Sequence, residues 1–271
     1  MQILVIHGSM RQGNTYQLTQ QVVSRLAHKP DVTITQVSIA DLGLPFCTSC
    51  HACLTKGEEY CPHDALLRSL RTAILECDGL ILSGTTYVRA LNAAMKNLLD
   101  HFAYLLHRPA LFGKHGMVIA TSAGLGEKNV AKYMQGLMAL WGINGAMAVT
   151  RTTKQQRLQS DSEELPEKAA RKLDKTVDAF YDSIRSQRQV NPTASIIAQH
   201  NFFRATSLSE YSESERDTEY WSLPGFSDRA YPVQIGWIKY QIGALAFSAA
   251  KLAMQIVGRS YMKRLKESSN E

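Results

Sequence analysis

QILVIHGSMRQGNT, residues 2–15, contains the pattern from which the fold class follows. Residues 2–7 form an apolar run that ends at Gly8, which is typical of a strand buried on both faces. Residues 15–27 then place four apolar side chains at helical spacing, namely Leu18, Val22, Val23 and Leu26. The segment therefore predicts a strand, a glycine-containing loop and a helix, in that order.

The same alternation continues along the chain. Further strands are expected at 32–39, 79–85, 116–124 and 144–151, and further helices at 65–76, 91–107, 127–141 and 161–187. Strict alternation implies parallel strands joined by right-handed helical crossovers. The sequence thus predicts an α/β fold, a flavodoxin-like three-layer sandwich around a five-stranded parallel sheet of order 2-1-3-4-5. In such sheets a ligand lies at the carboxyl ends of the strands.

The pattern changes near residue 188. Asn-Pro-Thr at 191–193 interrupts the preceding helix, because proline cannot continue it. We therefore expect two parts. The first is a flavodoxin-like domain over residues 1–187, which contains a cysteine-rich loop at 46–64. The second is a helical C-terminal extension over residues 188–271.

Residues 233–265 read as one helix, whose apolar run is interrupted by Lys251. That run is shorter than the roughly 20 apolar residues that a membrane span needs. We expect the helix to pack on the core or on another subunit, with weak membrane-surface contact through 233–266 as the alternative. The membrane alternative rests on the positive charge of this region, which would attract an anionic surface. Residues 229–271 hold seven Lys/Arg and two acidic residues. No basic-aromatic recognition motif is present, so nucleic acid is not an expected partner.

The loop over residues 7–15, HGSMRQGNT, is a candidate phosphate site. A helix N-terminus offers unpaired backbone N–H groups and the positive end of a dipole. The loop adds side-chain donors, namely Ser9, Arg11, Asn14 and Thr15, and two glycines that allow a tight turn, Gly8 and Gly13. Neither G-x-G-x-x-G nor G-K-[ST] occurs in it, so the usual dinucleotide and nucleoside-triphosphate loops are disfavoured.

GSMRQGNT resembles the G-S-x-R-x-G-N-[ST] loop of the NADPH-dependent FMN reductases, which have a flavodoxin-like fold. SGTTYVRALNAAMKNLLDH at 83–101 is similar to the family segment that lines the flavin ring, and ATSAG at 120–124 resembles the loop that closes over it. The resemblance covers roughly residues 1–185. This chain departs from the family where Gly84 and Thr85 replace a Ser-Pro pair.

The resemblance implies FMN as cofactor and NAD(P)H as electron donor. The flavin carries the chemistry, so no catalytic side chain is expected. Carried over residue by residue, the phosphate contacts are Ser9, Arg11, Gly13, Asn14 and Thr15, and the ring contacts are Thr85, Tyr87, Val88, Ser122 and Gly124. Lys96 and Asp100 are expected to form only a surface pair, and His7, His101 and His107 to be structural.

Four of the five cysteines lie in FCTSCHACLTKGEEYCPHDAL at 46–66, with spacing C-x2-C-x2-C-x7-C and a proline after the last. The N-terminus has no signal-peptide pattern, so we expect a cytoplasmic protein with reduced thiols. The spacing resembles cubane-cluster ligation in bacterial ferredoxins and the iron–sulfur flavoprotein branch of the family. We favour a [4Fe–4S] cluster on Cys47, Cys50, Cys53 and Cys61. Two alternatives stay open: zinc, with His51 and His63 as spare ligands, and redox-active thiols without a metal. Cys77 is expected to be a small buried hydrophobe.

These observations predict an FMN-dependent NAD(P)H oxidoreductase or electron-transfer flavoprotein that passes electrons between FMN and a [4Fe–4S] cluster. The alternatives are a cluster-free NAD(P)H:FMN or quinone reductase and a non-enzymatic thiol redox sensor. The expected partners are a small-molecule or protein electron donor and acceptor, together with further copies of the chain in a homo-oligomer.

Overall fold

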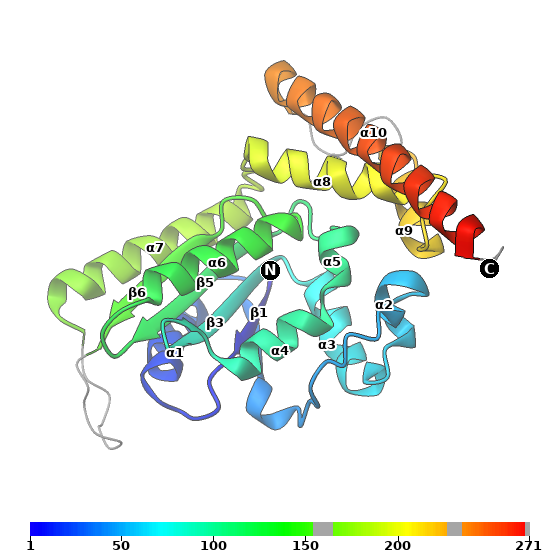
Figure 1. Ribbon diagram of the computed structural model, residues 1–271. Coiled ribbons are helices and arrows are strands. Elements are labelled where there is room, and N and C mark those ends of the chain that lie inside the picture. The colour runs from blue at the N-terminus through cyan, green and yellow to red at the C-terminus, as the bar shows by residue number, and fades with distance from the viewer. Residues whose placement is uncertain (154–164, 227–234, 269–271) are drawn as a thin grey trace. The chain divides into compact units, whose positions relative to one another are not determined.

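The computed structural model describes residues 1–153, 165–226 and 235–268, the last without the side chains of 258–268 (Figure 1). The first residues of the predicted 161–187 helix and of the predicted 233–265 helix lie outside these ranges. The chain divides into two compact units. The first comprises Met1–Cys50, Pro62–Phe102 and Ala110–Val190, and the second His51–Cys61, Ala103–Pro109 and Asn191–Glu271.

The first unit is built on a parallel sheet. Its long strands are β1 (Gln2–His7), β2 (Thr33–Ser38), β3 (Gly79–Tyr87), β5 (His115–Ser122) and β6 (Met147–Thr152). They lie in the order β2-β1-β3-β5-β6, and every neighbouring pair is parallel. Counted along the chain, this is the predicted order 2-1-3-4-5, so the flavodoxin-like fold class is confirmed.

A short sixth strand was not predicted. β4 (Ala90–Leu91) pairs antiparallel with the end of β3. It occupies the start of the predicted helix at 91–107, which in the structure is two helices, α4 (Ala93–His101) and α5 (Tyr104–His107). The prediction of one continuous helix was therefore wrong. The helix breaks at Phe102, whose φ of −102° and ψ of 20° depart from helical values.

Besides α4, the helices of the first unit are α1 (Asn14–Ala27), α3 (Asp64–Glu76), α6 (Glu127–Leu140) and α7 (Glu167–Arg185), with a 3-10 turn at Ile39–Asp41. Ile3 and Val5 of β1 join a core cluster with α1 and α7, whereas the alternate residues Leu4 and Ile6 are equally buried. Adjacent strand residues point to opposite faces, so the sheet is covered on both. The apolar side chains that α1 and α7 turn toward the sheet are buried, namely Leu18, Val22, Val23, Leu26, Leu173, Val177 and Phe180, while Ala169 is half-buried.

The second unit is helical. It contains α2 (Ala52–Thr55), a 3-10 turn at Glu58–Tyr60, α5, α8 (Ala194–Ser207), α9 (Glu215–Ser222) and α10 (Trp237–Ser268). The Thr193 hydroxyl accepts from the Ile196 N–H and caps α8, which explains why the chain restarts after the Asn-Pro-Thr break. α10 packs along α8 through Gly243, where a Cβ would lie 2.7 Å from the Asn201 side chain. No helix in the described ranges is long and apolar enough to cross a membrane.

Candidate functional site

Three predicted flavin-binding segments meet in a hydroxyl cluster. The Thr85 hydroxyl of β3 lies 2.9 Å from the Ser9 hydroxyl and 3.0 Å from the Thr15 hydroxyl. The Thr15 hydroxyl also lies 2.6 Å from that of Thr121 in β5. The loop after β1, the end of β3 and the end of β5 therefore converge at the carboxyl edge of the sheet.

The loop after β1 is fixed by its backbone. The Gly8 N–H donates to the Ser83 carbonyl at 2.7 Å, and a Cβ on Gly8 would lie only 2.4 Å from that oxygen. The Asn92 amide donates to the Gly8 carbonyl at 2.7 Å, and its oxygen accepts from the Thr85 N–H at 3.3 Å. Asn92 was not predicted as a site residue, because it belongs to no recognisable sequence motif.

The N-terminus of α1 suits an anion. Its N-cap residue, Gly13, provides no side-chain cap, and its first turn holds no acidic residue. The first backbone N–H groups of a helix lack partners within it, and Arg11 is exposed beside them. The Thr15 hydroxyl is committed to the buried cluster, so what this residue offers a phosphate is its backbone N–H. Gly13 has a φ of −86°, so this position does not require glycine's access to positive φ.

A hollow of about 380 Å³ lies beside this loop, lined by polar and aromatic groups that include His7, Ser9, Arg11, Tyr16, Gln36 and Asp41. The buried His7 places Nε2 2.8 Å from the Gln36 amide oxygen. None of the predicted ring residues lines this hollow.

The predicted ring residues differ in exposure. Tyr87 and Val88 are 72% and 87% exposed at the turn between β3 and β4. Gly124 is also exposed, with open space where a Cβ would lie. Ser122, by contrast, is buried, and its hydroxyl donates to the Glu127 carboxylate at 2.6 Å. That hydrogen bond holds the pKa of Glu127 below its ordinary value.

Two of the four clustered cysteines, Cys47 and Cys50, lie in the first unit. The Cys47 N–H donates to the Asn97 side-chain oxygen at 2.9 Å, and the Asn97 amide donates to the Pro45 carbonyl at 2.9 Å. Asn97 of α4 thus fixes the chain at the start of the cysteine segment. Cys50 is exposed. As expected, Lys96 and Asp100 form an exposed ion pair on the same helix.

The other two, Cys53 and Cys61, lie in the second unit. Cys53 is part of α2, and its carbonyl accepts from Arg108 Nη2 at 2.6 Å. The next carbonyl, that of Leu54, accepts from the Ser214 hydroxyl at 2.5 Å. Neither Arg108 nor Ser214 was singled out from the sequence, because each meets this segment from a distant part of the chain.

Cysteine thiolates are ligands of the kind that soft metal centres take. All five cysteines are described, and none forms a disulfide. The four clustered ones are exposed or half-buried, whereas burial raises the pKa of the Cys77 thiol to about 11. Cys77 is therefore the buried apolar residue that was expected. His63 Nδ1 lies 2.9 Å from His101 Nε2, and burial lowers the pKa of His101. His63 follows Cys61 by two residues in the sequence, so zinc stays open as the alternative.

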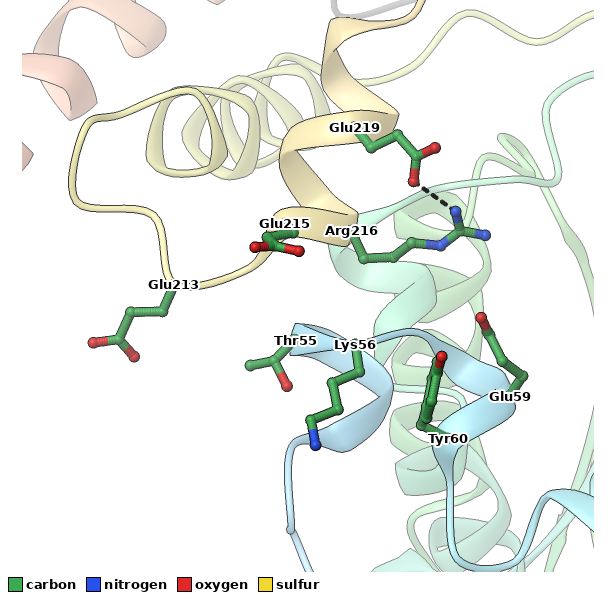
Figure 2. A pocket seen from close by; sticks show the side chains of 8 residues that line it. All are labelled: Thr55, Lys56, Glu59, Tyr60, Glu213, Glu215, Arg216 and Glu219. Atoms are coloured by element: carbon green, nitrogen blue, oxygen red, sulfur yellow. Dashed lines mark hydrogen bonds and ion pairs between the residues drawn. The ribbon is translucent and has the colours of Figure 1, made fainter.

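A second hollow, of about 720 Å³, lies within the second unit (Figure 2). One wall is the chain between Cys53 and Cys61, and the other is the start of α9 with the loop before it. Four carboxylates and two cations line it, namely Glu59, Glu213, Glu215, Glu219, Lys56 and Arg216. Arg216 and Glu219 form an ion pair of 2.7 Å at its edge.

Known structures share this fold. The apo form of an NADH:FMN oxidoreductase superposes with a TM-score of 0.53 and 21% identity, over 72% of this chain and 98% of that one. A flavone reductase gives a TM-score of 0.52 and 13% identity, over 71% of this chain and 66% of that one. At these identities the likeness concerns the fold.

Sequence similarity is more specific. An iron-sulfur flavoprotein of Archaeoglobus fulgidus is 32% identical over 145 residues, which are 53% of this chain and 64% of that protein. The match therefore spans less than two thirds of the relative. Residues 1–153, more than half of the chain, match the family described as NADPH-dependent FMN reductase. The chain therefore belongs to the NADPH-dependent FMN reductase family.

Proposed function

We propose that the chain is an FMN-dependent NAD(P)H oxidoreductase in which electrons pass between FMN and a [4Fe–4S] cluster. The observation that carries this proposal is the hydroxyl cluster of Ser9, Thr15, Thr85 and Thr121 beside the uncapped N-terminus of α1. When bound, FMN would supply two-electron exchange with the nicotinamide and single-electron exchange with the cluster.

In this proposal the residues of the chain bind and orient the flavin. Arg11 and the N–H groups of the first turn of α1 hold the phosphate, because a charge-assisted fork and a helix dipole both favour an anion. Tyr87 and Val88 contact the ring from the turn after β3, where both are exposed. Gly124 lets backbone approach the ring closely, since no side chain occupies that space.

Three observations support the cluster. The four thiols fall within fifteen residues at ferredoxin-like spacing. None of them forms a disulfide, and all four are exposed or half-buried. The curated relative is described as an iron-sulfur flavoprotein. A cluster-free reductase, a zinc protein and a thiol sensor are the competing assignments.

We further propose that α10 provides a surface for a second copy of the chain. Ile238, Leu245 and Leu252 follow one another at seven-residue spacing and are 69%, 70% and 59% exposed, which favours a helix partner. Weak contact with an anionic membrane surface is the alternative, and sedimentation with anionic vesicles distinguishes the two. The cytoplasmic location stays a prediction.

Anaerobic reduction with NADPH or NADH tests the proposed activity. The protein should oxidise either nucleotide catalytically with a quinone acceptor, and stepwise reduction should change both the flavin and the iron spectrum. Flavin that cycles while the iron never changes state would leave only the cluster-free reductase. Stoichiometric thiol oxidation without turnover would favour the sensor.

A further inference from the structure

Arg108 is a buried cation of the second unit, with 5% of its surface exposed. Its guanidinium is paired with the Asp217 carboxylate of α9 and lies 3.1 Å from the Glu58 carboxylate. Asp217 is itself 3% exposed, and its second oxygen lies 2.8 Å from Nδ1 of His107. Removing charges from water is costly even when they are paired. The buried ion pair of Arg108 and Asp217 therefore need not stabilise the fold, and the other contacts of Arg108 suggest a further role.

Those other contacts are with the cysteine segment. Arg108 Nη2 donates to the Cys53 carbonyl at 2.6 Å, and Nη1 donates to the Leu54 carbonyl at 3.2 Å. The Ser214 hydroxyl, which also caps α9, donates to the same Leu54 carbonyl. The last carbonyls of a helix have no partner within it, and one isolated turn is not stable in water. Arg108 and Ser214 thus supply partners that α2 lacks.

We propose that Arg108, oriented by Asp217, positions Cys53 as a cluster ligand, and that α9 of the C-terminal extension serves to hold this arginine. The inference rests on the proposed function, because it requires the cysteines to bind the cluster. Arg108 acts on the thiol through the backbone of α2 and is a positioning residue. The positive charge of Arg108 also lies close to Cys53, the proposed cluster ligand.

The chain offers a matched control in Arg216. This arginine precedes Asp217 by one residue, lies on the same helix and is also ion-paired, to Glu219 (Figure 2). It differs in exposure, since 40% of the Arg216 side chain and 65% of the Glu219 side chain face solvent. Arg216→Gln therefore removes an ion-paired arginine from α9, the helix that holds Asp217. It leaves intact the hydrogen bonds that Arg108 donates to the carbonyls of Cys53 and Leu54.

The test uses the full chain, prepared anaerobically with its flavin, in the forms wild type, Arg108→Gln, Arg108→Lys and Arg216→Gln. Iron release to a chelator should be at least about ten-fold faster in Arg108→Gln, with flavin content unchanged. After iron removal, alkylation of Cys53 should be several-fold faster, whereas that of Cys50 should not change. Arg216→Gln should match the wild type in all three measurements.

The midpoint potential of the bound iron provides a measurement that a purely structural role would not move. A nearby positive charge favours the reduced, more negative centre. Arg108→Gln should therefore lower the potential, and Arg108→Lys, which keeps the charge, should restore it toward the wild-type value. If Arg108→Gln does not fold, Asp217→Asn takes its place, because it keeps the shape of the partner and should also speed iron release.

The measurements distinguish failure of the proposed role of Arg108 from failure of the proposed cluster. Wild type that holds iron, with unchanged iron release and Cys53 labelling in the Arg108 variants, would overturn this inference alone. Wild type that holds flavin but no metal would overturn both this inference and the cluster in the proposed function, while leaving the reductase. Equal effects in Arg216→Gln would show that loss of any ion-paired arginine of the second unit suffices, which also contradicts a specific role for Arg108.

Discussion

The backbone N–H of Gly8 donates to the carbonyl of Ser83 at 2.7 Å, and this contact joins the loop after β1 to β3. It is close enough that a methyl group on Gly8 would lie 2.4 Å from the Ser83 oxygen. Two of the predicted flavin segments are thus held together before any ligand binds.

Gly8→Ala should therefore destabilise the protein by about 1–3 kcal/mol, the usual cost of overpacking. Urea unfolding of the flavin-free chain measures it. Gly13→Ala is the control, since a Cβ there would lie 3.6 Å from its nearest neighbour, and loss of a glycine N-cap should cost under about 1 kcal/mol. Equal losses in the two variants would contradict the close contact at Gly8.

The turn between β3 and β4 stores backbone strain. Val88 and Arg89 have φ values of 48° and 63°, in a region that β-branched residues avoid. Asn tolerates positive φ, so Val88→Asn should stabilise the chain by about 1 kcal/mol while weakening the contact that we propose between Val88 and the flavin ring. Thermal unfolding and flavin titration measure the two effects. Val88→Ile keeps the branch and should show no gain in stability.

Arg11→Ala should weaken FMN binding and leave the fold intact, because Arg11 is an exposed loop residue. Loss of one hydrogen bond to a charged group is worth about 1.5–3 kcal/mol, or roughly 10- to 100-fold in the dissociation constant. Fluorescence titration with FMN measures it. Arg68→Ala, an exposed arginine on α3, is the control. Undiminished FMN retention in Arg11→Ala would contradict the phosphate assignment.

Burial lowers the pKa of His115, which is 8% exposed in β5. The unfolded chain takes up a proton near pH 6.5, whereas the folded chain resists protonation until a lower pH. The unfolding free energy should therefore fall as pH drops below about 6.5. His115→Phe, which cannot titrate, should make the dependence between pH 7 and 5 shallower. An unchanged slope would mean that His115 does not contribute; His101, whose pKa burial also lowers, acts in the same direction.

Thiol labelling separates the clustered cysteines from Cys77. With a pKa of about 11, Cys77 is almost entirely protonated at pH 8, and only the thiolate reacts. In reduced, metal-free protein, iodoacetamide should modify the exposed Cys50 at least about ten-fold faster than Cys77, as peptide mass spectrometry would report. Unfolding in guanidinium should remove the difference. Comparable native rates would contradict the burial of Cys77.

Much of the fold could be predicted because its signals are local. The apolar runs at β1, β3 and β5 and the helical spacing of Leu18, Val22 and Leu26 each report on a few consecutive residues. The β3–β4 hairpin escaped prediction for a physical reason. Its turn is Val-Arg, where hairpin turns of positive φ are usually marked by Asn-Gly or Asp-Gly.

The site was only partly predictable. The phosphate loop is continuous in sequence and carries its own motif, so Ser9 and Thr15 could be named from it. Arg108 and Asp217 could not, because they are 109 positions apart along the chain and the pairing of two distant side chains has no local pattern. Asn97, which fixes the chain at Cys47, lies in an otherwise ordinary helix.

Cofactor analysis of anaerobically purified protein tests whether the chain binds both FMN and a [4Fe–4S] cluster. Absorption spectroscopy would be combined with assays for flavin, iron, sulfide and zinc. We predict one FMN together with about four iron and four sulfide per chain, as a cubane cluster requires. FMN with zinc and no sulfide, or FMN with no metal at all, would contradict it.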